Sequence, residues 1–327
     1  MTAGADASSP TGVLRRVDWA ARLRGVGILL PFVILFVVLS LTSSSFFTKP
    51  NLLNILDQQS ATLIIAAAGT LVLIAGGIDL SVGAIYGFAG VTSAHFALHH
   101  SAGVAIVLGV GAGLLIGVGN GIVTTVFRIN ALIGTLAMSF IVGGCSALIT
   151  KGNLLVLFDK EGFGKLARTE FATVTTSIWL MVVVVIAIGL LLATTTAGRY
   201  MYAAGGNAEA ARLAGVRVDA VRMLTFAISG TAAGLAGVID TSRVLSAQAS
   251  PNDTALAFTV LAGIVVGGTS IMGGEGAVWR TVVGVLFIAL IGNGYLLLQF
   301  DPLYEQITMG ALLLAAVGLD ALSRRHG

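Results

Sequence analysis

Ten long runs of apolar residues follow one another along this chain, and they constrain its fold more than any other feature of the sequence. Each is close to the ~20 apolar residues that a helix needs to cross the hydrocarbon core of a bilayer. Charged residues make up only 10% of the chain, against about 25% in a typical soluble domain. The sequence therefore predicts an all-α membrane protein, a polytopic bundle of about ten transmembrane helices. The runs lie near residues 25–45, 57–77, 80–98, 102–127, 130–150, 174–194, 223–243, 256–272, 277–298 and 303–322.

The residues that usually carry chemistry exclude several classes of protein. The single cysteine, Cys145, rules out an internal disulfide and a thiolate metal cluster. No phosphate-binding G-x-x-x-x-G-K-[ST] loop and no H-E-x-x-H motif occurs. His95 and His99 are four residues apart, which fits a solvated helix end better than a zinc site. With a net charge of +3 and no basic run, the sequence predicts no catalytic residue, no cofactor, no metal and no nucleic-acid partner.

The distribution of Lys and Arg predicts the orientation in the membrane. If the N-terminus is cytoplasmic and the spans alternate, 12 of the 18 basic residues fall on the cytoplasmic side. A signal peptide is the alternative for the first apolar run, but no small-residue cleavage site follows it. We expect a membrane domain between two cytoplasmic tails, with one long outer loop and one long inner loop. These parts are the tail 1–24, the membrane domain 25–322, the outer loop 151–173, the inner loop 195–222 and the tail 323–327.

Glycines recur every four residues on one face of the fourth apolar run, at Gly109, Gly113, Gly117 and Gly121. Helices in lipid associate through close backbone approach, which small residues allow. The pattern predicts a tight helix contact within the bundle. A seam that moves or dimerises is the alternative.

Asp79 lies between glycines in a segment that otherwise reads as membrane-spanning. Charges inside a membrane are costly and are paired or functional. We expect a helix break here, where the carboxylate either caps the third helix or lines a polar path. A similar glycine spacing recurs much later in the chain, and two interrupted helices in separate halves indicate a transport path. The candidate path and break residues are Gly76, Gly77, Asp79, Ser81, Gly83, Asn120, Gly267, Gly268, Thr269, Ser270 and Asn293.

Two further polar features fall inside or beside apolar runs. Asp240 and Arg243 are three residues apart, so they can pair on one helix face near the outer end of the seventh run. Asn120 and Asn293 occupy middle to inner positions of their helices, where each can bond a neighbouring helix.

The inner loop contains a short segment with helix start and stop signals. Asn207 is suited to cap a helix, the next residues favour helix, and Gly215 suits its end. A short capped helix at a basic membrane surface fits docking to a partner protein. A simple re-entry loop is the alternative.

These segments resemble a known family, the ribose/xylose/galactoside permeases of ABC importers. The inner loop is similar to the E-A-A-x-x-x-G pattern of such permeases, although the later I-x-L-P part is missing. The stretches Gly77–Gly83, Gly198–Gly215 and Gly267–Gly276 carry the rest of the resemblance. The ATPase-docking residues it implies are Asn207, Glu209, Ala210, Ala211, Arg212, Leu213 and Gly215.

The resemblance implies a subunit of the bacterial inner membrane that translocates a pentose such as ribose or xylose, or a related polyol. It also implies a second permease copy in a homodimer, a separate cytoplasmic ABC ATPase, a soluble sugar-binding protein and surrounding membrane lipid. Many members carry an acid before the Gly-Gly-Thr-Ser motif, whereas this chain has none between Thr254 and Gly263. The alternative is a proton- or sodium-coupled secondary transporter, which would rely on Asp79, Asp240 or Asp320.

Overall fold

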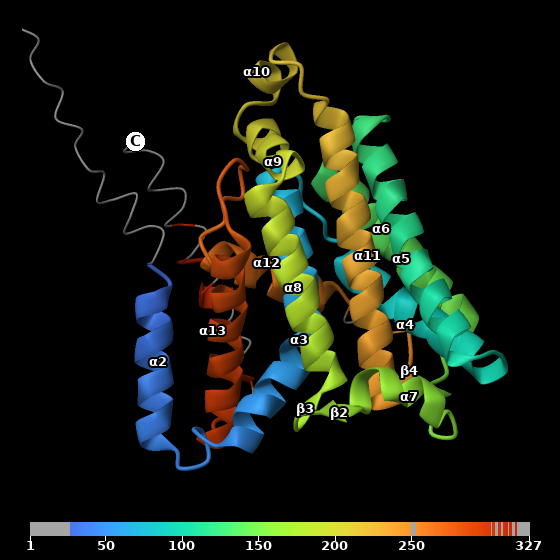
Figure 1. Cartoon of the computed structure of the whole chain (residues 1–327), viewed down its shortest axis with the longest axis vertical. Coiled ribbons are helices and arrows are strands. Elements are labelled where there is room, and N and C mark those ends of the chain that lie inside the picture. The colour runs from blue at the N-terminus through green and yellow to red at the C-terminus, as the bar shows by residue number, and fades with distance from the viewer. Residues whose placement is uncertain are drawn as a thin grey trace, which may run out of the picture.

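The computed structural model describes residues 27–249 and 253–301, together with part of the stretch from 303 to 318. Long helices stand side by side in a bundle (Figure 1), with short helices and two-residue strands at its ends. The helices are α2 (Leu29–Thr42), α3 (Lys49–Ile74), α4 (Val82–His99), α5 (Ala102–Thr125), α6 (Ala131–Thr150), α7 (Glu161–Arg168), α8 (Thr176–Thr194), α9 (Thr196–Gly206), α10 (Ala208–Leu213), α11 (Val218–Val244), α12 (Asp253–Val266) and α13 (Val278–Leu297). The strands are β1 (Leu155–Val156), β2 (Glu170–Phe171), β3 (Val174–Thr175) and β4 (Ser246–Ala247).

The predicted all-α membrane architecture is confirmed. Each of the first nine apolar runs coincides with a helix, and the tenth is helical at its described residues up to Gly318. Six described helices, namely α3, α5, α6, α8, α11 and α13, are long and apolar enough to cross a membrane. The count of ten spans stays a prediction, and the tails 1–24 and 323–327 lie outside the described residues.

Helix α3 begins at Lys49, well before residue 57 where its apolar run starts. Thr48 starts it by accepting a hydrogen bond from the Asn51 amide, and a proline stands in its first turn. Every residue of α3 from Ser60 to Ile74 is buried. A helix that is apolar on all sides belongs in the interior of a bundle, so α3 forms the centre of the main core.

The glycine stripe of α5 lies against α11, as the sequence predicted. A Cβ built on Gly117 would lie 2.5 Å from the Phe226 carbonyl oxygen and 2.9 Å from the Gly230 Cα. Gly113 approaches Gly234 in the same way, where a Cβ would lie 2.7 Å from the Gly234 Cα. Neither backbone could come this close if either side carried a larger residue. The stripe therefore serves as a packing seam inside the chain.

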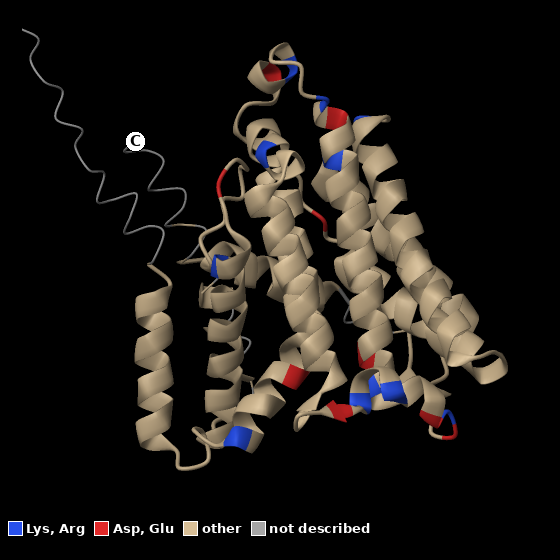
Figure 2. Ribbon diagram, viewed as in Figure 1, with Lys and Arg blue, Asp and Glu red and all other residues tan. Residues whose placement is uncertain are grey.

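Charged residues gather at the two ends of the bundle and leave its middle largely apolar (Figure 2). The end that carries α10 holds Arg128, Arg199, Arg212, Arg217, Arg222 and Arg280; the end that carries α7 holds Lys49, Lys151, Lys160, Lys165, Arg168 and Arg243. These described residues split evenly. The predicted excess on one side comes from the tail arginines, which lie outside the described residues.

The long loop 151–173 forms a lid of short elements across the α7 end of the bundle. Strand β1 pairs antiparallel with β4, which follows α11, with Leu155 opposite Ala247. Helix α7 packs Phe163 and Ala167 inward, and the Ser242 hydroxyl of α11 donates to the Phe163 carbonyl at 2.7 Å. The loop is therefore fixed to the end of α11.

Replacing Gly117 with Leu should destabilise the protein, because its side chain would enter the seam with α11. Overpacking of this kind typically costs about 1–3 kcal/mol. Gly111 of the same helix is the matched control, since a Cβ there meets nothing within 4 Å. We expect a lower melting temperature in detergent for Gly117→Leu and little change for Gly111→Leu. Equal melting temperatures for the two variants would contradict the seam.

Candidate functional site

The first helix break lies between α3 and α4 and follows from its glycines. Gly76 has a φ of +79°, a backbone conformation that residues with a side chain rarely adopt. The chain then has no regular secondary structure through Asp79 until α4 begins at Val82. Gly83 was predicted to belong to this break, but it lies in the first turn of α4 and is buried there.

The Asp79 carboxylate is the centre of a buried hydrogen-bond network. It accepts from the Ser81 amide at 3.0 Å, from the Ser81 hydroxyl at 2.6 Å and from the Ser229 hydroxyl of α11 at 2.9 Å. Asn120 of α5 donates to the Ser81 hydroxyl oxygen at 2.7 Å. Thr135 of α6 accepts from the Leu80 amide at 3.0 Å. The break is thus held by three neighbouring helices, α5, α6 and α11, which supply partners that the interrupted helix no longer provides.

The expected cap on the following helix takes a different form. Ser81 occupies the cap position of α4, and no side-chain cap bond is made there. Asp79 instead closes a tight turn two residues along, at the Ser81 amide. The carboxylate therefore stabilises the turn that leads into α4, and it leaves the first helical amides of α4 alone.

The second break separates α12 from α13 and has the same cause. Gly268, Gly273 and Gly274 all have positive φ values, between +78° and +89°. Thr269 and Ser270 are buried within it, and the Thr269 hydroxyl has no hydrogen-bond partner among the described residues. A Cβ on Gly267 would lie 2.5 Å from the Arg280 carbonyl oxygen, so this glycine lets α12 meet the start of α13.

The two breaks meet each other and the end of α9, at a place we call the glycine junction: Ile74, Gly76, Gly205, Gly273 and Gly274. The Gly274 amide donates to the Ile74 carbonyl at 2.9 Å and so gives the last carbonyl of α3 a partner. A Cβ on Gly273 would lie 3.0 Å from the Gly76 Cα, and one on Gly205 would overlap the Ile74 carbonyl oxygen. The two segments with similar glycine spacing therefore contact each other in the folded protein.

A tyrosine on α9 strengthens this contact. The Tyr202 hydroxyl donates to the Gly276 carbonyl at 2.8 Å. Burial raises the pKa of the Tyr202 phenol above its ordinary value, more than the nearby Arg280 lowers it. The phenol therefore stays neutral and keeps its donor proton at physiological pH.

Helix α10 forms at the tip of the inner loop, as its start and stop signals predicted. The Asn207 side chain accepts from the Ala210 amide at 2.9 Å, and Gly215 ends the segment with a φ of +85°. Arg212 donates to Asp219 of α11 at 3.0 Å. Glu209, Ala210 and Leu213 are exposed.

Ala211, one of the predicted docking residues, faces the interior of the protein. Ala211 is 6% exposed and packs with Ala204 and Val218 in a small core of its own. Helix α10 therefore uses Ala211 to fix itself to α9 and α11. Leu213, which is 85% exposed, is the large apolar side chain that α10 presents outward.

Asn293 bonds a neighbouring helix, which was one of its two predicted roles, and it does so away from the glycine junction. It forms a reciprocal amide pair with Asn51, at 3.0 and 3.2 Å between nitrogen and oxygen atoms. Asn51 is in the first turn of α3, so the pair joins α13 to the opposite end of α3. Asn293 therefore holds two helices together and has no contact with the breaks.

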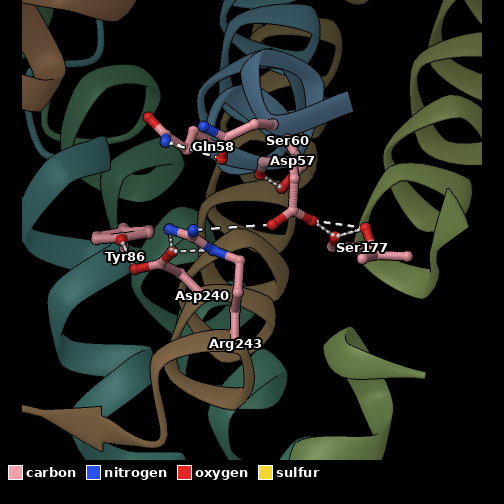
Figure 3. A network of polar contacts seen from close by, with 9 residues as sticks. Asp57, Gln58, Ser60, Tyr86, Ser177, Asp240 and Arg243 are labelled. Atoms are coloured by element: carbon pink, nitrogen blue, oxygen red, sulfur yellow. Dashed lines mark hydrogen bonds and ion pairs between the residues drawn. The ribbon is translucent and has the colours of Figure 1, made fainter. Parts of the chain in front are cut away.

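A charge network at the α7 end of the bundle, which we call the Asp57–Arg243–Asp240 network, was only half predicted (Figure 3). Arg243 donates to Asp240 at 2.6 Å, as expected, but it also lies 3.8 Å from Asp57 of α3. Asp57 further accepts from Ser177 of α8. Its part was missed because residue 57 opens its apolar run, whereas α3 starts a full two turns earlier. Thr48, a good cap residue followed by Pro50 in the first turn, was the signal for the longer helix.

The described residues offer no site for a metal ion. No group of three or more His, Cys, Asp and Glu side chains converges among them. The network at Asp79 consists of serine, asparagine and one carboxylate from separate helices. Such an arrangement can hold a broken helix or line a polar path, and it has no nucleophile–base pair of the kind that hydrolases use.

Interrupted membrane helices that meet at one end of a bundle, below a short capped surface helix, are typical of a membrane transport protein. Comparison with known proteins identifies the kind. The chain matches the family model of the branched-chain amino acid transport system permease component over residues 51–317. It belongs to this family of ABC-importer permease components.

Relatives match along most of the chain. It is 34% identical to the ribose import permease protein RbsC of Escherichia coli K12 over 296 residues, 89% of this chain and 92% of the relative. It is 36% identical to RbsC of Bacillus subtilis over 308 residues, 94% of this chain and 95% of the relative. It is 36% identical to the L-arabinose transport system permease protein AraH of E. coli K12 over 300 residues, 91% of each. No solved structure matches the chain.

These relatives decide between the two kinds of transporter raised by the sequence. They are permease components, so ATP hydrolysis belongs to a separate subunit and the chain is not itself an enzyme. The proton- or sodium-coupled alternative receives no support from them.

Asp79 should tolerate asparagine better than leucine. An asparagine oxygen can still accept from Ser81, and its amide group can donate to the Ser229 hydroxyl. Leucine would leave buried donors unpaired, each at a cost of about 1–3 kcal/mol. We expect Asp79→Asn to lower the melting temperature and the uptake activity only slightly. We expect Asp79→Leu to lower both strongly. Loss of uptake in well-folded Asp79→Asn would instead point to a titrating role.

Gly205 and Gly206 provide a matched pair for the glycine junction. A Cβ on Gly205 would overlap the Ile74 carbonyl oxygen, whereas one on Gly206 meets nothing within 4 Å. We expect Gly205→Ala to lower the melting temperature or the yield of folded protein, because α9 must move away from α3. Gly206→Ala should behave like the wild type. Equal melting temperatures for the two variants would show that α9 and α3 are not in close backbone contact at Gly205.

Proposed function

We propose that this chain is the membrane-spanning permease subunit of an ATP-driven importer for a monosaccharide. The substrate is a pentose such as ribose, xylose or arabinose, or a related polyol. The relatives with ribose and arabinose in their names match about nine-tenths of the chain, which supports a sugar over the branched-chain amino acid named by the family model.

The observation that carries the proposal is the glycine junction. Helix α9 ends in it, and α10 follows directly from α9. A push on α10 would therefore reach the Ile74 carbonyl and the Gly274 amide, where both helix breaks are joined. Because glycine backbones touch there without intervening side chains, displacement of α9 requires the two breaks to move.

The proposed importer also implies an orientation in the membrane and a set of partner proteins. The α10 end faces the cytoplasm with both termini and the 195–222 loop, and α10 docks an ABC ATPase. A binding protein delivers sugar to the loops at the α7 end. Two permease copies form the translocation unit. The tail arginines, Arg15 and Arg16 with Arg324 and Arg325 among them, support this orientation through the positive-inside rule.

The docking role of α10 can be tested on Leu213. A buried apolar anchor usually carries much of the energy of a protein contact, so Leu213→Glu should weaken ATPase binding by at least about tenfold. The permease itself should fold, because Leu213 is 85% exposed. The matched control is Phe158→Glu, which changes an apolar side chain that is 69% exposed in the loop beside α7.

The measurement is ATP-dependent uptake of labelled ribose and arabinose into vesicles that contain permease, ATPase and binding protein. The wild type should hydrolyse ATP in response to loaded binding protein, and Leu213→Glu should not. The control Phe158→Glu is compared in co-purification with the ATPase, where it should match the wild type, because Phe158 lies at the opposite end of the bundle from α10. Uptake driven by an ion gradient without ATP would refute the importer. A normal response of Leu213→Glu would move the docking surface to another part of the α10 end.

A further inference from the structure

A cavity of about 410 Å³, lined by polar and apolar residues alike, lies between α4 and α11 at the α7 end of the bundle, beside the Asp57–Arg243–Asp240 network. Its wall includes Tyr86, Asp240, Thr241 and Gln248 as polar residues, with Leu154 and Leu256 as apolar ones. It is bordered by α4, α11, α12, β4 and the residue that precedes β1. A cavity of this size with a few converging polar groups has the character of a small-molecule site.

The Asp240 carboxylate is held in a fixed orientation at the cavity wall (Figure 3). One oxygen accepts from the Arg243 guanidinium at 2.6 and 3.1 Å, and the other accepts from the Tyr86 hydroxyl at 2.5 Å. A carboxylate has about four acceptor positions, and these bonds use three. Asp240 can therefore accept one more hydrogen bond from a ligand without giving up its present partners.

The charge of the network restricts which ligands fit. Asp57 and Asp240 are two carboxylates, and both lie on the single guanidinium of Arg243. No Lys or Arg lines the cavity among the described residues. A ligand carboxylate or phosphate would therefore face surplus negative charge and an arginine already engaged. Hydroxyl groups suit the wall, because Asp240 accepts while Thr241 and Gln248 both donate and accept.

We propose that this cavity is the low-affinity sugar site of the permease and that it selects neutral polyhydroxylated molecules. Asp240, Thr241 and Gln248 bind the substrate hydroxyls, while Leu154 and Leu256 contact the apolar face of the ring. Tyr86 and Arg243 are positioning residues that aim the Asp240 carboxylate. The proposal rests on the proposed function and adds to it the place and the chemistry of substrate recognition.

The test uses substitutions that leave the charge network intact, because a change of Asp240 would also release Arg243. Gln248→Ala removes an exposed amide, and Thr241→Val replaces a hydroxyl with a methyl group of similar size. The control is Asn153→Ala, which removes an exposed amide outside the cavity at the same end of the bundle. The purified full-length permease is titrated with D-ribose, L-arabinose, L-leucine and D-ribose 5-phosphate, and binding is followed by saturation-transfer NMR.

We expect saturable binding of at least one sugar and none of leucine or the phosphate. Gln248→Ala and Thr241→Val should each weaken sugar binding by about five- to tenfold, the effect of one lost hydrogen bond. Asn153→Ala should bind as the wild type does. Uptake by the complete importer is measured in parallel, so that failure of the proposed function, with no sugar imported, is recognised separately. If sugar is imported but the wild type shows no binding, or both cavity variants bind it unchanged, the site lies elsewhere; leucine binding in the cavity would refute its selectivity.

Discussion

The arrangement of this permease depends on one constraint: backbone amides and carbonyls that leave a helix within a membrane must find partners in the protein. Two helices are interrupted here, and the second break supplies a partner that the first lacks. The Gly274 amide satisfies the Ile74 carbonyl at the end of α3, and Arg222 of α11 donates to the Ala75 carbonyl at 3.1 Å. Side chains from α5, α6 and α11 satisfy the rest of the first break. The first break is therefore held both by the second break and by neighbouring helices.

Glycine residues allow these backbones to approach each other, and they also connect the helix breaks to the α9–α10 segment at the surface. Where Gly205 meets Ile74, and where Gly117 meets α11, backbones touch with no side chain between them. Contacts of this kind transmit displacement because no flexible group can absorb it. The same property that packs the bundle thus links the α9–α10 unit to the interrupted helices. In an ABC-importer permease this is the part of the chain nearest to the proposed ATPase contact.

The opposite end of the bundle is organised by charge. Asp57, Asp240 and Arg243 come from α3 and α11, and Ser177 adds α8. One guanidinium between two carboxylates fixes three helices relative to one another, and it leaves a hydrogen-bonding carboxylate on the wall of a cavity. The two ends are therefore held by different interactions. Backbone contacts dominate at the α10 end, and oriented polar side chains dominate at the α7 end.

The sequence by itself determined the membrane class, the helical runs, the glycine seam, the capped α10 segment and the two breaks, because hydropathy, small-residue spacing and backbone strain are local properties. Tertiary structure decided which groups meet. It placed Ala211 inward, Asn293 beside Asn51, and Asp57 on Arg243, over separations that no local pattern records. It also turned two similar glycine segments into one junction. Residues far apart in the sequence come into contact only when whole helices pack against each other, so these contacts depend on the folded bundle.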